Sequence, residues 1–160
     1  MNETINEYLM KAKQEMKRVD HIYWVSLKYT RTVDVIRNAI ERMLNVLFFA
    51  VDCFLAYAVK QGKIDSIPAT PIQKAELAKS ILSEADKSEL VEGVDFYLFL
   101  RKLLKAPFSR EDEYRKTVRM IVDLEGKYVS VDLEELANYY AKVKAFLSAI
   151  EDVVKCEEVL

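Results

Sequence analysis

Apolar residues recur at steps of three and four along almost the whole chain. In residues 3–29, for example, Ile5, Leu9, Ala12 and Met16 share one side of a helix with 3.6 residues per turn. We find no stretch with the alternation of apolar and polar residues that is typical of a half-buried strand. The three glycines and three prolines fall almost only between the periodic stretches, as helix breakers do. The pattern predicts helices over residues 3–29, 33–61, 71–83, 88–105, 109–125 and 132–156.

Residues with the chemistry of helix caps stand at several of these predicted starts. A hydroxyl group at Thr30 or Thr32 can accept a hydrogen bond from the free N–H groups of the second helix. Thr70, followed by a proline, is typical of a helix start. Residues 109–112 and 132–135 have the spacing of capping boxes. Residues 127–131, between the last two helices, are expected to form a short extended connector.

The chain has the length and composition of one folded domain. It has 160 residues, of which 51% are hydrophobic, and a net charge of −2, which suits a single apolar core. We expect an all-α, up-and-down bundle of five to six helices over residues 1–160, with the second and last helices central. Residues 43–59 approach the length of a membrane span, but Asn45 and Asp52 lie within them. A buried core helix is therefore expected, and no membrane.

Composition removes most catalytic chemistry. A single histidine, His21, cannot supply a di-iron bundle, and two cysteines with one histidine cannot close a structural zinc site. Three isolated glycines give no phosphate-binding loop. We expect a non-enzymatic protein without metal or cofactor. The two cysteines imply no disulfide framework, so a cytoplasmic location is expected. Abundant Lys, Arg and Glu with few Gln and His are typical of proteins from thermophiles.

A polar stripe follows one side of the second predicted helix. Asn38, Arg42, Asn45 and Asp52 are three, four or seven residues apart, so they share one face of an otherwise apolar helix. Buried Asn and Asp need hydrogen-bond partners. The stripe predicts either a polar cleft or dimer contact, or a buried network completed by another helix. In the second case, Arg42 or Arg101 is the expected partner of Asp52.

Basic residues concentrate at residues 101–119, around the turn expected between the fourth and fifth helices. Seven Lys and Arg stand against three acidic residues there, with Phe108 and Tyr114 among them. Some of these charges also fit solvated i,i+4 pairs on a helix. Phosphate binding needs clustered cations and tolerates irregular spacing, so the segment predicts RNA or other anion binding. The residues expected to carry it are Arg101, Lys105, Arg115 and Arg119.

Three carboxylates form a ladder at the start of the fourth helix. Glu89, Glu92 and Asp95 are three residues apart, so they lie on one helical side and together could hold Mg²⁺. The ladder half-resembles the Glu-x-x-Glu element of all-α nucleoside triphosphate pyrophosphatases, but their downstream Glu-x-x-Asp element is missing. A magnesium-dependent nucleotide pyrophosphohydrolase is therefore the alternative function. An acidic first turn, favoured by the helix dipole, accounts for the same residues.

The last predicted helix has a wide apolar face. Its apolar residues alternate steps of four and three, the spacing of a helix packed along a near-parallel neighbour. The face fits an interior helix of a bundle, and it also fits a homodimer interface. The residues expected in such an interface are Tyr139, Phe146, Leu147 and Val153.

The order of the predicted helices resembles that of the HEPN-like helical domains. The resemblance covers residues 28–155. It rests on a long helix that begins Arg31-Thr-Val-Asp-Val-Ile-Arg-Asn-Ala-Ile-Glu-Arg-Met-Leu and ends at Gly62, and on Phe99-Leu-Arg-Lys-Leu-Leu-Lys-Ala-Pro107 at a later helix end. Members of that family include RNA-cleaving toxins and non-catalytic partners of small nucleotidyltransferases, and they commonly form homodimers.

Active members of that family carry an arginine followed four to six residues later by a histidine. Arg101 matches the arginine, but Lys105, Ala106 and Pro107 stand where the histidine would be. The group that would transfer a proton or polarise a phosphate is therefore absent. The resemblance implies a catalytically inactive protein that binds RNA or a protein partner, as a homodimer.

Overall fold

The computed structural model describes residues 3–156. The helical elements are α1 (Glu3–His21), a π-helical turn η1 (Ile22–Ser26), α2 (Leu27–Tyr29), α3 (Val33–Lys60), α4 (Pro71–Glu84), α5 (Ser88–Lys105) and α6 (Leu133–Cys156). The strands are β1 (Phe108–Glu111), β2 (Arg119–Leu124) and β3 (Lys127–Asp132).

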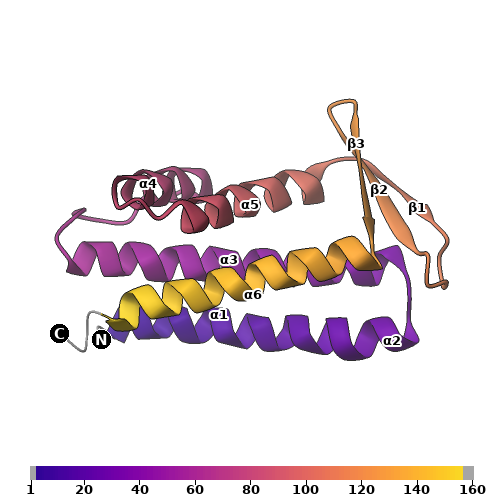
Figure 1. Cartoon of the computed structure of the whole chain (residues 1–160), viewed down its shortest axis with the longest axis horizontal. Helices are drawn as coiled ribbons and strands as arrows, with labels where there is room; N and C mark the ends of the chain where they lie inside the picture. Colours follow the sequence, from indigo (N-terminus) through magenta and orange to yellow (C-terminus); the bar gives the residue numbers. More distant parts are fainter. Residues whose placement is uncertain (1–2, 157–160) are drawn as a thin grey trace.

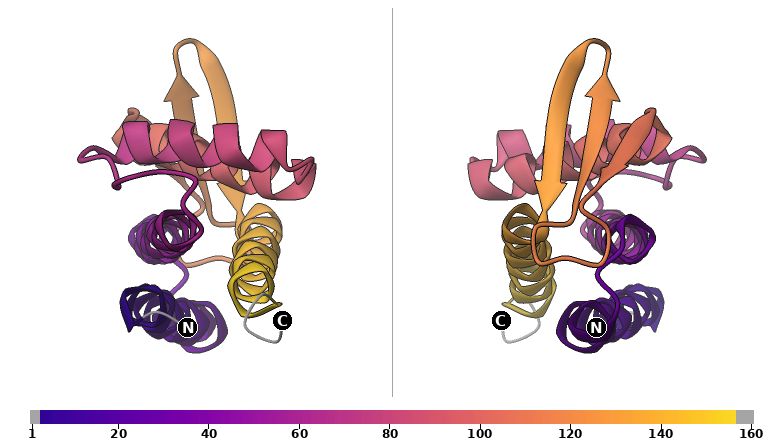
Figure 2. Two further views of the ribbon diagram at one scale, coloured as in Figure 1. Left: turned by 90° about the vertical axis from the view of Figure 1, so that its left-hand side faces the viewer. Right: turned by 90° about the vertical axis from the view of Figure 1, so that its right-hand side faces the viewer.

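The long helices run back and forth along one axis (Figure 1). The first helical segment, α1 with η1 and α2, is antiparallel to α3, and α5 and α6 lie on the other sides of α3. Viewed along this axis, α1, α3 and α6 form a triangle, α4 lies across its top, and the sheet closes one end (Figure 2). The centre of the core is α3, which contacts α1, α4, α5 and α6.

The helix α3 has the composition that its position requires. From Ala50 to Ala58 every residue is buried, because neighbouring helices cover it on all sides. It is long and apolar enough to cross a membrane, and 67% of its most apolar window is buried within the fold. This burial agrees with the core helix that we expected from the polar residues Asn45 and Asp52 within the apolar stretch.

The predicted caps of three helices are confirmed, whereas the capping box predicted at residues 109–112 opens no helix. Thr32 Oγ1 accepts a hydrogen bond from Val35 N at 3.3 Å, so Thr32 rather than Thr30 caps α3. Thr70 caps α4 in the same way, at 3.2 Å from Gln73 N. The Asp132 carboxylate accepts from Glu135 N at 2.8 Å and opens α6. Each cap satisfies an N–H group that has no partner within its helix.

The helix predicted over residues 109–125 is wrong, and with it the all-α fold class: the protein is mainly helical, with a small antiparallel sheet. The strands are ordered β1-β2-β3. Val118, Met120 and Val122 are fully buried, whereas Arg119 and Ile121 between them are partly exposed. This is the period of two that a strand buries. The 127–131 connector is indeed extended, as β3.

The turn between β2 and β3 explains why the chain reverses here. Glu125 and Gly126 both have positive φ angles, 54° and 87°, which is the geometry of a tight hairpin turn. Asp123 Oδ1 accepts a hydrogen bond from Gly126 N at 2.8 Å. The resulting hairpin rises beyond α5 (Figure 1).

The sheet packs one face on the helices. The register pairs Phe108 with Val122 and Met120 with Val131, and directly paired residues share a face, so these four side chains point the same way. The Arg37 side chain of α3 crosses to this face, with its guanidinium 4.1 Å from the Phe108 ring centroid and 3.0 Å from Leu104 O. The sheet therefore sits against the beginning of α3 and the end of α5.

Candidate nucleic-acid interface

The loop between β1 and β2 crosses the end of the molecule to reach the junction of α2 and α3. Tyr114 N donates a hydrogen bond to Arg31 O at 2.6 Å, so residues 83 positions apart in the chain are held backbone to backbone. In the right-hand view of Figure 2 this loop descends from the sheet toward α3. The loop and the α2–α3 junction thus form one surface.

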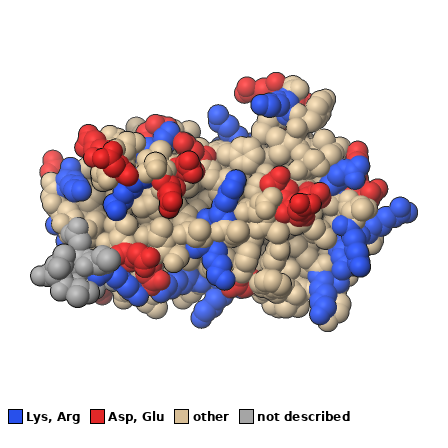
Figure 3. All heavy atoms as spheres, viewed as in Figure 1, with Lys and Arg blue, Asp and Glu red and all other residues tan. Residues whose placement is uncertain are grey.

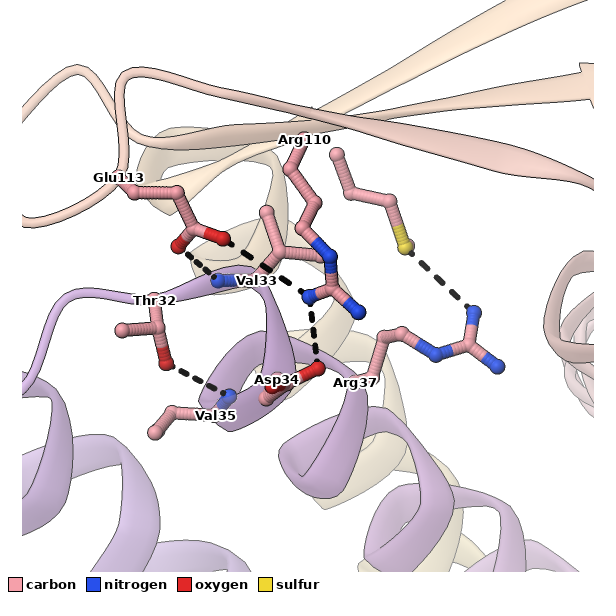
Figure 4. A network of polar contacts seen from close by, with 8 residues as sticks. Thr32, Val33, Asp34, Val35, Arg37, Arg110 and Glu113 are labelled. Carbon is pink, nitrogen blue, oxygen red and sulfur yellow. Dashed lines mark hydrogen bonds and ion pairs between the residues drawn. The ribbon is translucent and has the colours of Figure 1, made fainter.

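Glu113 ties this loop to the first turn of α3. Its Oε2 accepts a hydrogen bond from Val33 N at 2.9 Å, next to the N-cap residue Thr32 (Figure 4). A carboxylate is favoured here because the helix dipole places partial positive charge at the N-terminus. Arg110 lies beside it, with Nη1 at 2.7 Å from Asp34 Oδ1 and 3.8 Å from Glu113 Oε1. The hydrogen bond that Arg110 donates to the Asp34 carboxylate raises the pKa of Arg110.

Glu111 of β1 and Asp112 of the loop are both engaged by Arg119. Arg119 lies 2.5 Å from Glu111 Oε2 and 3.5 Å from Asp112 Oδ2. Thr117 Oγ1 donates to the same Asp112 oxygen at 2.9 Å and closes the loop. Every acidic residue of the 111–113 run is therefore engaged by the protein itself.

Two residues of the loop have backbone angles that L-amino acids seldom adopt. Asp112 has φ of 53° and Tyr114 has φ of 69°. Asp tolerates this region, but for a bulky aromatic residue it is a true outlier that costs about 1–3 kcal/mol. Tyr114 nevertheless projects into solvent, with 76% of its surface exposed. The loop therefore holds an aromatic ring outside the core at an energetic cost.

Basic and aromatic residues follow Tyr114 in the chain and precede or include Arg31, whose carbonyl the Tyr114 backbone binds. We call the set the basic–aromatic end: Lys28, Tyr29, Arg31, Tyr114, Arg115 and Lys116. Tyr29 is 80% exposed, and it lies two residues before the carbonyl that binds the Tyr114 backbone, a span of about 7 Å. Within residues 3–156, none of the four cations forms an ion pair. Figure 3 shows Lys and Arg gathered at this end of the molecule, over α2 and the loop.

The predicted anion-binding residues divide into separate groups. Arg115 belongs to the basic–aromatic end. Arg119 lies on β2, where its guanidinium is occupied by two carboxylates. Arg101 and Lys105 lie on α5; the Arg101 guanidinium is 5.9 Å from the Tyr97 ring centroid. Arg119 is paired with Glu111, three residues after Phe108, the first residue of β1. About 10 Å of strand therefore separates Arg119 from the end of α5 that carries Lys105.

The polar stripe of α3 does not form one cluster. Asn38 is exposed and Asn45 is half-buried. Arg42 Nη1 lies 3.3 Å from Glu15 Oε2 of α1. Asp52 is 3% exposed, and its expected partner was wrong, because the residue beside it is Lys74 of α4.

The pair of Asp52 and Lys74 joins α3 to α4. The ammonium lies 3.0 Å from Asp52 Oδ1, although not in hydrogen-bond geometry. It also lies 4.8 Å from the Phe48 ring centroid. The stripe therefore serves two helix–helix contacts rather than a cleft.

The face of α6 that fitted a homodimer interface is largely covered by the chain itself. Tyr139 and Phe146 are 4% exposed and Leu147 is 7% exposed, while Val153 is half-buried. Burial raises the pKa of Tyr139. An interior helix accounts for most of this face, and the homodimer stays a prediction.

The carboxylate ladder lies along the solvent side of α5. Glu89, Glu92 and Asp95 are all exposed, and Asp95 Oδ1 is 2.7 Å from Lys79 Nζ. Within the part of the chain that the structure describes, no three His, Cys, Asp or Glu side chains are placed to share a metal ion.

Comparisons of the chain with protein-family models, with curated proteins and with solved structures give no match. The resemblance to HEPN-like domains stays a prediction.

Sequence reasoning missed half of the basic–aromatic end. Lys28, Tyr29 and Arg31 were assigned to a helix end and a connection, and no local signal joins them to the loop 83 residues later. The hydrogen bond from Tyr114 N to Arg31 O brings them together. Each of the two segments has a tyrosine next to basic residues in the sequence, but only the fold makes the two segments one surface.

Proposed function

We propose that this protein is a non-enzymatic interaction domain that binds single-stranded RNA at its basic–aromatic end. The observation that carries the proposal is Tyr114: an exposed ring on a backbone at φ of 69°, held by a segment whose three acidic residues are all engaged by groups of the protein itself. Strained backbone persists where surrounding contacts enforce it, and such places cluster at binding sites. Here the enforced feature is an aromatic ring among unpaired cations.

Exposed aromatic rings and cations are the two kinds of side chain that proteins commonly use to bind single-stranded nucleic acid. Bases stack on aromatic side chains, with about 1–3 kcal/mol for each base. Lys28, Arg31, Arg115 and Lys116 would neutralise phosphates. If all four do so, log K should fall with log salt at a slope of about −3, from about −0.7 for each phosphate of a single strand.

The acidic residues explain why this surface attracts an anion although the chain is acidic overall. The net charge is −2, but the four acidic residues nearest the loop, Asp34 and those at 111–113, are each engaged by Arg110, Arg119 or the first turn of α3. The cations that remain face solvent without a partner. Local charge, rather than net charge, therefore decides what this end binds.

Binding of a short unstructured RNA, measured by fluorescence anisotropy across a NaCl series, tests the proposal. We expect Tyr114→Ala to weaken binding about tenfold, the loss of one stacked base. Tyr128→Ala is the matched control, because Tyr128 is 71% exposed but lies on the β2–β3 hairpin. Equal effects of the two substitutions would contradict the proposal.

A charge reversal separates this surface from the helix end that sequence also suggested. Arg115→Glu with Lys116→Glu should abolish binding, whereas Lys102→Glu with Lys105→Glu, on the exposed end of α5, should change it little. Absence of binding by the unchanged protein at low salt would refute the RNA function. Binding lost only with the α5 pair would move the site to that helix. The RNA should remain intact, as the missing histidine of the HEPN-like pattern implies.

A further inference from the structure

A groove runs between α5 and α6, away from the basic–aromatic end. Its central hollow has a volume of about 410 Å³ and is lined by Gly93, Phe96, Lys142, Phe146 and Ala149, among others. The hollow shares Phe96 and Lys142 with a second one that continues toward β3. At the other side it shares Leu90 and Ala149 with a third that reaches Asp152. The three hollows adjoin along the two helices, and together they are here called the α5–α6 groove.

The floor of the α5–α6 groove is apolar and aromatic. Gly93 brings the two helices together, because a Cβ at this position would overlap Phe146 Cδ1 and lie 2.7 Å from Cε1. Further along, the rings of Phe96 and Phe99 pack against Tyr139, with centroid distances of 5.2 Å and 6.1 Å. Phe96 and Phe99 keep part of their surface exposed. The groove follows α5 from Ser88 to Phe99, about 17 Å or three helical turns.

The rim of the groove is acidic. Glu89, Glu92 and Asp95 stand one turn apart along the α5 side, and Asp152 stands on the α6 side. Within residues 3–156, Glu89, Glu92 and Asp152 form no ion pair. Two lysines also line the hollows. Lys87 lies at the third hollow, and Lys142, at the centre, lies over the Phe96 ring, 5.1 Å from its centroid. The carboxylate ladder is thus the edge of an apolar groove.

We propose that the α5–α6 groove receives a basic amphipathic helix from a partner protein. A helix laid into a groove inserts apolar residues spaced at i, i+3 or i+4 and i+7, and three turns of floor match that spacing. Lys and Arg beside those anchors would meet the unpaired carboxylates of the rim. Charge argues against a second copy in a face-to-face arrangement, because two acidic rims would then oppose each other.

The partner can be identified by selection from a library of helical peptides displayed on phage, with the full-length protein as bait. The selected peptides should carry apolar residues at i, i+3 or i+4 and i+7, with Lys or Arg beside them. Synthetic copies of them should bind with a dissociation constant that rises steeply with salt. Selected peptides that are acidic or lack the apolar spacing, or a selection that yields no peptide, would overturn the proposal.

Variants then place the peptide. Ala145 lines the central hollow and is exposed, so Ala145→Trp should fill the groove without disturbing the core and weaken peptide binding at least tenfold. Ser148→Trp is the matched control, since Ser148 is exposed on α6 and lines none of the three hollows. Glu89→Lys with Glu92→Lys should also weaken binding at least tenfold.

Two further results would overturn the proposal. Equal binding by the Ala145→Trp and Ser148→Trp variants would place the peptide elsewhere. A dimer of the unchanged protein that Ala145→Trp dissociates, measured by sedimentation velocity, would show that a second copy occupies the groove. RNA binding by Ala145→Trp should remain unchanged, so failure at the groove and failure at the basic–aromatic end are distinguishable.

Discussion

The contact between Gly93 and Phe146 leads to a prediction whose sign depends on the neighbour. Gly93 lies inside α5, where replacing Gly by Ala normally stabilises a protein by about 1 kcal/mol. Here the added methyl group would overlap Phe146 Cδ1, lie 2.7 Å from Cε1 and 3.0 Å from Cγ. Phe146 is 4% exposed, so the protein packs around most of its ring, and only the side that borders the central hollow is open.

The magnitude follows from the two opposing effects. Overpacking a closed core costs about 1–3 kcal/mol, and helix propensity returns about 1 kcal/mol. Gly93→Ala should therefore lower the free energy of unfolding by about 1 kcal/mol. In a Phe146→Ala background all three crowding atoms are gone. The same substitution should then raise the free energy of unfolding by up to about 1 kcal/mol.

Urea unfolding followed by circular dichroism measures both differences. Four proteins are needed: the unchanged chain, each single variant and the double variant. The expected coupling free energy between the two positions is about 2 kcal/mol. Stabilisation by Gly93→Ala in the unchanged chain would refute the reasoning, because it would mean that α5 and α6 separate easily at this point. The groove floor would then not be preformed.

Three further changes have defined outcomes. Lys74→Met should lower the free energy of unfolding in urea by about 3 kcal/mol, because it leaves the carboxylate of Asp52, 3% exposed, without its counter-ion; adding Asp52→Asn should restore most of the loss. Glu151 has a pKa below its usual 4.5, mainly because Lys13 donates a hydrogen bond to it and also because Lys155 does. Its contribution to stability is complete above that usual pKa and is lost as the pH falls through the lower folded pKa. In the Glu151→Gln variant the midpoint temperature of unfolding should therefore fall less steeply as the pH is lowered through this range. Tyr114→Gly should raise the free energy of unfolding by about 1 kcal/mol by relieving the positive φ, while RNA binding weakens.

The helices could be predicted from sequence because their signals are local. The apolar face of α3, its cap at Thr32 and the capping Asp132 of α6 all act within one or two turns. The same holds for Gly62, which follows α3 with φ of 76°, a value that glycine adopts without strain. Periodicity and caps are short-range chemistry, and a single sequence displays them.

The sheet could not be predicted in the same way. The alternation of Val118, Met120 and Val122 is short, and its charged neighbours also fit helical pairs. The strands pair with one another within residues 108–132, but the buried face of the sheet packs on distant residues, such as Arg37 Nη1 with Met120 Sδ at 3.7 Å, 83 residues apart. Such a contact leaves no local trace. The error extended to the site, because a helix would have placed Glu111 beside Arg115 at i,i+4, whereas in the structure Glu111 pairs with Arg119.

The energetics of the loop support a role in binding rather than in stability. The ion pairs of Arg110 with Asp34 and of Arg119 with Glu111 have side chains between 38% and 75% exposed, and such surface pairs contribute little to stability. The backbone of Tyr114 costs about 1–3 kcal/mol, so the loop yields little or no net stability. What these contacts do achieve is position, because they fix one exposed ring beside unpaired cations. A glycine at position 114 would adopt the same positive φ without this strain. The presence of tyrosine is explained if the exposed ring itself contributes to binding.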